Sequence, residues 1–580
     1  METFSQLVPW INGSVLVLIL AALISNLWRA GQIFAIALLY FLLTGQLGVE
    51  EALANFVNPV LITLVLLLLI SIVLEKNRFI DIATRHALDC GYRTALFRLC
   101  TMTAFLSSML NNTAIVAAFM GKVSGQKRHA ASRLLIPLSY SAIVGGMLTL
   151  IGTSTNLIIN SFVVNAGLEP LGFWDFFKIG VPVVMAVLLV LIVIGQYILP
   201  DSSQSNESYN KFLMEARVEE GSPLIGKSIK ENGIRDLESI FLVEIWREGR
   251  LITPVHPNHL IRANDILIFN GDPDFISELD RFSGLILLTE EERIPVGNLT
   301  EVVIASGSGM ARKLVRNLGL RIRYDAAVVA LGRGNQELTG KLSNVRLQVG
   351  DRLLIATGED FKALSEETTD FHILREHVAS TSLDARNSII SISLFLFALA
   401  GSIMGLFPLL EGLIGVFIIY LLANYTHLEE LRNRIPFELI AVIGSALGIA
   451  QVFTNDGTVH AIAQNAAVYL QGFPPWMVMA GLFMVTMVLT EVVTNNVAAA
   501  LSFPLASGLA QALNIDPGAF IMTIAFAASC SFMTPVGYQT NLMVYSAGNY
   551  RLTDYLRAGF PIMLVYACVS IAMISWLYLH

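Results

Sequence analysis

Apolar runs separated by short polar segments make up most of the chain. The first runs, at about residues 11–29, 32–48 and 57–75, are close to the roughly 17–25 residues that cross a bilayer as a helix. Further runs of this kind lie at about 134–163, 176–199, 387–405, 409–425, 434–453, 516–547 and 556–579. This pattern predicts a polytopic α-helical membrane protein.

Two apolar stretches have a polar centre. Residues 99–121 carry Asn111 and Asn112 in the middle and basic segments on both flanks. This pattern predicts a re-entrant hairpin that enters and leaves the membrane on one side, and one ordinary span is the alternative. The preceding segment, 76–98, mixes Arg and Lys with apolar residues, so we expect it to lie along the membrane interface. A second hairpin is predicted at about 475–511.

The polar motifs repeat at matching points of two membrane halves. Residues 149–157 align without a gap with residues 534–542, an offset of 385. Asn111-Asn112 aligns with Asn495-Asn496 at an offset of 384, and residues 175–182 align with 554–561 at 379. Because the matches keep their order and nearly their spacing, we predict related halves at 1–200 and 387–580, each with a hairpin and a broken helix.

Residues 201–386 differ from both halves, because charged residues are frequent and the apolar runs are too short to span. The segment predicts two small α+β soluble domains, at about 205–290 and 291–376. Each is expected to contain a helix, a strand, a hairpin and a final strand. The residues that repeat 86 positions apart are Gly233 and Gly319, Arg247 and Arg333, and Asp265 and Asp351.

Composition and charge add a location and an orientation. The 580 residues are 54% hydrophobic and 14% charged, whereas a soluble chain is about a quarter charged. If 76–98 is cytoplasmic, nearly all loop Lys and Arg lie on that side, as the positive-inside rule requires. The soluble domains are then cytoplasmic, both termini are outside, and the two halves are inverted relative to each other. We expect a multi-pass cell-membrane protein, such as one of a bacterial inner membrane.

Several kinds of chemistry are not supported by the sequence. The four cysteines form no CxxC pair, so neither a disulfide framework nor a metal-thiolate site is expected. No nucleophile–base or metal-ligand cluster suggests an enzyme. Gly307-Ser-Gly309 lacks the rest of a dinucleotide fingerprint, so no nucleotide cofactor is expected. No nucleic-acid partner is expected either.

The helix breaks at Gly152 and Gly537 favour ion binding. A broken membrane helix frees carbonyl oxygens, which suit Na⁺, and exposes helix N-termini, which suit anions. Neutral amides could bind a dianion when Na⁺ supplies positive charge. A lone Asn in a span is more often a helix–helix contact, but repetition of the Asn pair favours a site. Glu491, one turn before Asn495, is either a proton or cation site or a residue at a water-filled mouth.

With these motifs the chain resembles the divalent-anion:sodium symporter family. The family's Ser-Asn-Thr hairpin tips correspond to Asn111-Asn112-Thr113 and Asn495-Asn496-Val497, with Asn for Ser in both and Val497 for Thr. The resemblance implies two Na⁺ sites around one dianion, and a homodimer. The implied substrate ligands are Asn111, Asn112, Thr113, Thr155, Asn156, Asn495, Asn496, Thr540 and Asn541. The implied Na⁺ ligands are Ser107, Asn111, Asn112, Gly152, Glu491, Asn495, Asn496 and Gly537.

The soluble repeats resemble the C-terminal modules of potassium-conductance regulators, the TrkA-C type. Sulfate-type symporters carry such paired insertions, so this resemblance favours sulfate over a dicarboxylate. Binding of a small regulatory ligand, dimerisation and plain packing all remain open for these modules. The resemblance implies no cofactor other than Na⁺ as the coupling ion.

The sequence therefore predicts Na⁺-coupled import of a small divalent anion by alternating access. One alternative is an arsenite or Na⁺/H⁺ antiporter of the same architecture, which Glu491 favours. The other is a regulated cation channel, suggested by the soluble repeats, although the sequence has no Thr-Val-Gly-Tyr-Gly-like filter.

Overall fold

The structure of the protein is a computed structural model of the whole chain. It describes residues 2–25, 28–75, 88–126, 128–200, 213–234, 237, 240–247, 250–252, 255–271, 279, 281–288, 299–305, 308–333, 336–338, 342–358, 360–365, 368, 370–375, 385–427, 431 and 435–579.

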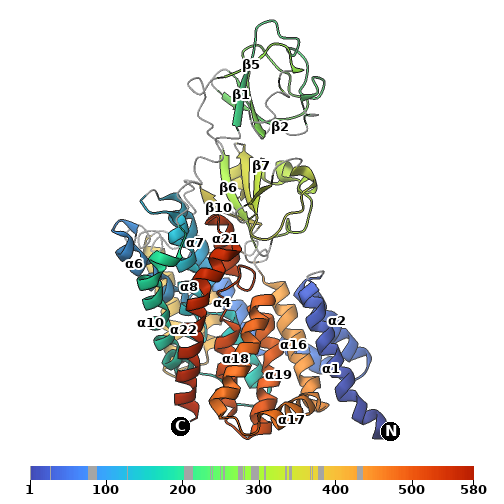
Figure 1. The fold of residues 1–580 in the computed structure, drawn as a ribbon, viewed down its shortest axis with the longest axis vertical. Helices are drawn as coiled ribbons and strands as arrows, with labels where there is room; N and C mark the ends of the chain where they lie inside the picture. Colours follow the sequence, from blue (N-terminus) through green and yellow to red (C-terminus); the bar gives the residue numbers. More distant parts are fainter. Residues whose placement is uncertain are drawn as a thin grey trace.

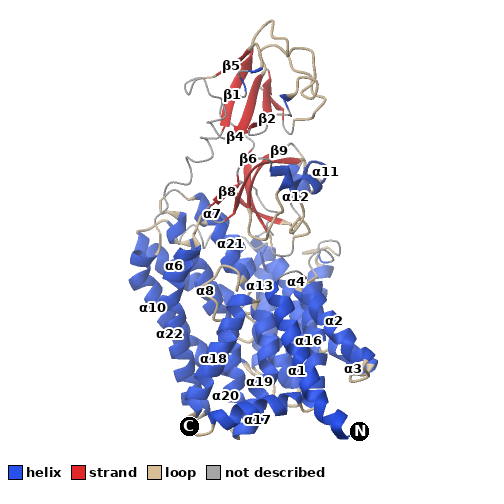
Figure 2. Ribbon diagram, turned by 45° about the vertical axis from the view of Figure 1, so that its right-hand side comes forward, coloured by secondary structure: helices blue, strands red, loops and turns tan. Residues whose placement is uncertain are grey.

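A helical membrane part carries two small β-sheets on one end, and both chain termini lie at the opposite end (Figure 1). In the described ranges, eight helices are long and apolar enough to cross a membrane. Figure 2 shows the strands confined to two sheets, one next to the helical part and the other farther from it. The predicted fold class, a polytopic helical membrane protein with inserted α+β units, is confirmed.

From the hairpins onward, the described helices of the two membrane halves follow one another in the same succession. In the first half the helices are α1 (Glu2–Ser25), α2 (Ala30–Leu43), α3 (Val49–Phe56), α4 (Pro59–Glu75), α6 (Tyr92–Ser107), α7 (Asn112–Gly125), α8 (Leu135–Gly146), α9 (Ser154–Asn165) and α10 (Phe173–Ile198). In the second half they are α13 (Ala385–Ile403), α14 (Leu409–Leu422), α16 (Phe437–Asn455), α17 (Thr458–Leu470), α18 (Pro475–Val492), α19 (Asn495–Leu513), α20 (Pro517–Ala528), α21 (Gln539–Ala547) and α22 (Leu552–Tyr578).

Equivalent elements of the halves run in opposite directions. The last helices, α10 and α22, pack side by side, and Arg557 near the start of α22 donates to the carbonyl of Tyr197 near the end of α10 at 3.5 Å. The hairpin α6–α7 enters from the end that carries the sheets, whereas α18–α19 enters from the other end (Figure 1). The repeats are therefore inverted.

The first hairpin is re-entrant rather than one ordinary span, because the segments at its two ends contact each other. Arg128 donates to the Asp89 carbonyl at 2.8 Å, and His129 Nε2 lies 2.9 Å from the Cys90 carbonyl. The hairpin, α6 and α7, is longer than the predicted 99–121. The difference arises because Arg93 and Arg98 are exposed on the first arm, α6, whose other face is buried. Of the predicted interfacial segment, residues 76–87 lie outside the described part of the chain.

The two sheets have the same topology. The first contains β1 (Leu213–Val218), β2 (Ile240–Arg247), β3 (Arg250–Ile252), β4 (Ile266–Gly271) and β5 (Leu285–Leu287), in the order β3-β2-β4-β1-β5. The second contains β6 (Leu299–Ile304), β7 (Ala326–Arg333), β8 (Gln336–Leu338), β9 (Arg352–Thr357) and β10 (Phe371–Arg375), in the matching order β8-β7-β9-β6-β10. We call these units module 1 and module 2.

Each module contains the same ion pair, in which the aspartate is buried and the arginine is partly exposed. The Arg247 guanidinium donates two bonds to Asp265, at 2.8 and 2.7 Å, and Arg333 does the same to Asp351, at 2.7 and 2.8 Å. The Asp351 carboxylate raises the pKa of Arg333 by hydrogen bonding. Gly233 and Gly319 both have positive φ, 68° and 62°. The 86-residue repeat therefore follows positions that each module needs for its fold. The predicted leading helix is the short α11 (Leu320–Tyr324) in module 2, whereas most of the equivalent segment after Gly233 in module 1 lies outside the described residues.

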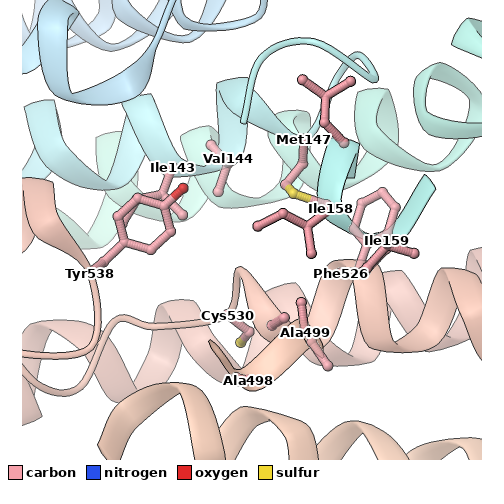
Figure 3. Close-up of a cluster of buried hydrophobic side chains, with 14 of the residues drawn as sticks. Ile143, Val144, Met147, Ile158, Ile159, Ala498, Ala499, Phe526, Cys530 and Tyr538 are labelled. Carbon is pink, nitrogen blue, oxygen red and sulfur yellow. The ribbon is translucent and has the colours of Figure 1, made fainter. Parts of the chain in front are cut away.

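A tight apolar seam joins the halves. Ile143, Val144 and Met147 come from the end of α8, and Ile158 and Ile159 come from α9 (Figure 3). They lie opposite Ala498, Ala499 and Phe526 of α19 and α20 (Figure 3). Small residues on α19 allow the helix backbones to approach closely.

Module 2 packs directly on the membrane part. Strand β10 lies against α7, and the fully buried Val303 of β6 belongs to the membrane core. A Cβ atom on Gly350 would lie only 2.9 Å from Cγ of Leu542 on α21. Module 2 thus contacts two helices, α7 and α21, whose N-termini form part of the site described next.

Candidate functional site

Four helix N-termini meet where the halves join. They belong to α7 and α19, the second arms of the hairpins, and to α9 and α21, which follow the helix breaks. The side chains at these N-termini contact one another in a crossed pattern, each hairpin tip against the broken helix of the other half.

The first hairpin tip contacts the second break. The side-chain amide of Asn112 lies 2.8 Å from the hydroxyl of Tyr538. The Thr113 hydroxyl donates to Oε1 of Gln539 at 3.1 Å. The tip Asn111 caps α7, because its side chain accepts from the backbone N–H of Thr113 at 3.0 Å.

The second hairpin tip contacts the first break. The Asn495 amide donates to the Thr155 hydroxyl at 2.7 Å, and the Ser154 hydroxyl donates to Oδ1 of Asn496 at 2.9 Å. The two breaks also meet, because the Thr153 and Tyr538 hydroxyls are 3.0 Å apart. Thr153 and Tyr538 are aligned positions of the repeat, so this contact lies near the axis that relates the halves.

Three of the predicted Na⁺ ligands lie together in the first half. The Asn112 amide is 2.6 Å from the Ser107 hydroxyl. Its nitrogen is assigned to that side, because there it also lies 3.1 Å from the carbonyl oxygen of Gly152 and 3.2 Å from that of Ala142. Ser107, Asn112 and Gly152 thus place a hydroxyl, an amide and a carbonyl of the helix break side by side.

Both break glycines sit against backbone, which explains the residue type. A Cβ atom on Gly152 would lie 2.6 Å from the carbonyl oxygen of Gly146 and 2.9 Å from that of Ser107. One on Gly537 would lie 2.5 Å from the Thr490 carbonyl oxygen. No side chain fits at either position without moving the chain.

Three predicted ligands form hydrogen bonds within the breaks or to α8, and not to the hairpin tips. Asn156 donates to the Thr149 carbonyl and Asn541 to the Ser531 carbonyl, both at 2.8 Å. The Thr540 hydroxyl accepts from the Ser139 hydroxyl on α8 at 2.9 Å. Within the two breaks, three buried oxygens have no hydrogen-bond partner among the described residues: Oδ1 of Asn156 and Oγ of Ser529 and Ser531.

A pocket opens beside the first tip. It lies between α4, the turn that carries Asn111, and the first break at Gly152 and Ser154. The α4 side is apolar apart from Ser71. Among the described residues, the lining has no charged side chain. A ligand in this pocket would meet amides, hydroxyls and leucine side chains.

Glu491 is bonded to backbone. Its Oε1 accepts from the N–H groups of Phe532 and Met533 at 2.9 and 2.8 Å. Its Oε2 accepts from the N–H and hydroxyl of Thr534 at 2.9 and 2.6 Å. These four donors satisfy the carboxylate within the second break.

Sequence reasoning missed Tyr538, Gln539 and Ser154 as members of the contact network. All three lie inside the aligned segments 149–157 and 534–542, so the alignment of these segments could have indicated them as candidate site residues. Tyr538 was missed because its aligned residue, Thr153, has different chemistry. The roles of the predicted ligands in binding stay predictions.

Inverted repeats whose re-entrant hairpins meet broken helices define the architecture of secondary membrane transporters. The chain belongs to the citrate transporter family, whose sequence model matches residues 14–523. It is therefore a multi-pass membrane protein of a transporter family rather than an enzyme.

Some relatives match nearly the whole chain, and others match only part of it. An uncharacterized transporter of Synechocystis is 26% identical over 565 residues, 92% of this chain and 91% of that protein. Sodium/sulfate cotransporter 1 of Chlamydomonas reinhardtii is 25% identical over 371 residues, 60% of this chain and 41% of that protein. Sodium-dependent low-affinity dicarboxylate transporter 1 of Caenorhabditis elegans is 28% identical over 146 residues, 25% of each chain.

Proposed function

We propose that the protein imports a small divalent anion together with Na⁺ by alternating access, with sulfate as the favoured substrate. The observation that carries the proposal is the convergence of four helix N-termini, those of α7, α9, α19 and α21. Each has N–H groups in its first turn that lack acceptors within the helix, and the positive end of a helix dipole, which together attract an anion.

The neutral lining of the pocket supports the Na⁺ requirement. Phosphate- or carboxylate-binding sites commonly use Arg or Lys, but the described lining around Asn111 and Ser154 has neither. A dianion placed in an uncharged, partly buried site needs a compensating charge. Bound Na⁺ supplies that charge and makes anion binding depend on the cation.

The first half offers the clearest place for Na⁺. Free carbonyls at helix breaks and the negative ends of half-helices bind Na⁺ in transporters with inverted repeats. The cluster beside Asn112 offers the Ser107 hydroxyl and the Gly152 carbonyl of the break, and the buried Oδ1 of Asn156 is a further oxygen without a partner among the described residues. In the second half, Oγ of Ser531 is a comparable free oxygen.

The choice of sulfate rests on relatives and on one residue. Relatives include proteins named as sodium/sulfate cotransporters and as sodium-dependent dicarboxylate transporters. Val497 stands where Thr113 stands in the first tip, and it is buried, so the second tip offers one hydroxyl fewer. A compact inorganic dianion needs fewer contacts than a longer dicarboxylate, which is the second candidate.

For transport, we propose that the hairpins and broken helices move against a scaffold of α1, α2, α4, α13, α14 and α16. The soluble modules would face the cytoplasm, as the distribution of Lys and Arg favours.

Uptake into proteoliposomes tests the proposal. Labelled sulfate and succinate are each supplied with and without an inward Na⁺ gradient, for the wild-type protein and for Asn112→Ala and Asn496→Ala. We expect Na⁺-driven sulfate uptake that falls at least about tenfold in both variants, because each loses contacts of the crossed network. Glu411→Gln, an exposed position at the start of α14, is the control. Flux of arsenite or Na⁺ that depends on a pH gradient, without uptake of either anion, would instead favour an antiporter.

A further inference from the structure

The two helix breaks differ in length. α8 extends to Gly146, and carbonyls of its last turn accept from the N–H groups of Met147 at 3.2 Å and Leu148 at 3.0 Å. α20 ends at Ala528, so residues 529–531 are unwound where the aligned part of α8 is still helical. The N–H groups of Phe532 and Met533, aligned with Met147 and Leu148, therefore lack helical acceptors.

Packing on the neighbouring helices confirms this alignment. A Cβ atom on Gly180 of α10 would lie 2.8 Å from the Met147 carbonyl oxygen. A Cβ atom on Gly559 of α22, the residue aligned with Gly180, would lie similarly close to the Phe532 carbonyl oxygen. Met147 and Phe532 thus occupy equivalent places although only the first follows directly on a helix.

Glu491 replaces the missing turn. Its carboxylate accepts from the N–H groups of Phe532 and Met533 at 2.9 and 2.8 Å, the two groups that have no helical acceptor because α20 is shorter. At the aligned position of the first half stands Ser107, whose hydroxyl contacts Asn112 instead. The acidic residue and the missing helical turn therefore occur together in the second half.

The hydrogen bonds of the Glu491 carboxylate all stay within the second break. Among the described residues, every hydrogen bond to the Glu491 carboxylate comes from residues 532–534. Charge-assisted bonds from several N–H groups stabilise the ionised form in place. A carboxylate without hydrogen-bond donors near the proposed anion site would repel a dianion. The four donors to Glu491 offset part of its charge and so reduce this repulsion.

We infer that Glu491 is a positioning residue, which fixes segment 529–538 so that Tyr538 and the N-terminus of α21 face the first hairpin tip. It is neither a ligand of the coupling cation nor the carrier of a coupled proton. The inference deepens the proposed function and rests on it for the transport readout.

A first experiment reads the position of the segment without any transport. Cys530 lies in segment 529–538 and is fully buried. Its alkylation by a membrane-permeable maleimide is followed by peptide mass spectrometry in full-length Glu491→Gln protein. We expect the rate to rise at least about tenfold over wild type, because an amide offers its NH₂ group to N–H donors. Glu411→Gln is the matched control. An unchanged rate in Glu491→Gln would overturn the inference.

A second experiment separates the possible roles of Glu491 in transport. We expect Glu491→Gln to raise the KM for the anion about tenfold, with the Na⁺ dependence at saturating anion and the pH profile unchanged. Thr534→Ala removes one donor and should shift the anion KM in the same direction by less, which keeps the test valid if Glu491→Gln folds poorly. A raised Na⁺ requirement alone, or loss of pH dependence, would refute the positioning role. If wild-type protein transports no anion, the proposed function fails while the Cys530 result still stands.

Discussion

The paired asparagines show what a sequence reveals at the scale of single residues. Repetition of Asn111-Asn112 and Asn495-Asn496 was enough to predict where the halves carry polar tips. Their partners could not be predicted, because the contacts join residues 426 and 342 positions apart, across the two halves. Local patterns contain no information on such pairs. The same limit hid the backbone partners of Glu491, which depend on where α20 ends.

Gly152→Ala should disrupt the site, because the obstacles to a Cβ atom there are carbonyl oxygens and not movable side chains. We expect a loss of about 1–3 kcal/mol of stability from overpacking and a strong loss of uptake. Thermal unfolding of the purified protein and uptake in proteoliposomes are the measurements. Gly481→Ala in α18, where nothing lies within 4 Å of the added methyl, is the control and should leave both unchanged. Equal behaviour of the two variants would contradict the close packing of the break.

At the scale of elements, hydrophobic runs located the spans well and their ends less well. Runs such as 176–199 and 556–579 correspond to α10 and α22 within a few residues. The first arm of the hairpin was predicted too short, because Arg93 and Arg98 lower the hydropathy of an arm that is exposed on one face. In the modules the repeat pointed to the Arg–Asp pairs. Strands β1 and β5 of module 1 gave no comparable signal.

Asp351→Asn should loosen module 2. The substitution weakens the bonds from Arg333 and from the N–H of Gln348, which Asp351 accepts at 2.7 Å while almost fully buried. Loss of one partner of a fully buried pair costs about 3–5 kcal/mol. The cost should be lower here, because the Arg333 side chain is 33% exposed and the neutral amide keeps some bonds. Limited proteolysis of the full-length protein should cut residues 299–375 faster, while Asp360→Asn at an exposed position should not change the rate. Resistance equal to wild type would show that the pair is dispensable.

At the scale of the whole molecule, the inversion of the halves was predictable and the docking of module 2 was not. Inversion followed from the repeat and from the distribution of Lys and Arg. Docking depends on shape, with Val303 buried in the membrane core and Gly350 against Leu542. No periodicity marks such surfaces. The boundaries of the predicted domains stay a prediction.

Substitutions of two neighbouring valines in β6 should distinguish the docking of module 2 on the membrane part from the folding of the module itself. Successive residues of a strand face opposite sides: Val303 packs on the membrane part, and Val302 belongs to the core of module 2. Val303→Asp should increase hydrogen exchange in α7 and α21 while β7 and β9 stay protected. Val302→Asp should instead expose the module strands. Identical exchange patterns in the two variants would contradict the docked arrangement.

The central claim is that four helix N-termini form an anion site that becomes effective only when Na⁺ is bound. Its most direct test is the binding of labelled sulfate to the purified protein in Na⁺ and in an equal concentration of choline, followed by scintillation proximity. We expect saturable binding in Na⁺, loss of that binding in choline, and loss in Asn112→Ala even in Na⁺. Equal sulfate binding in Na⁺ and choline would show that the site does not need the cation and would contradict the account.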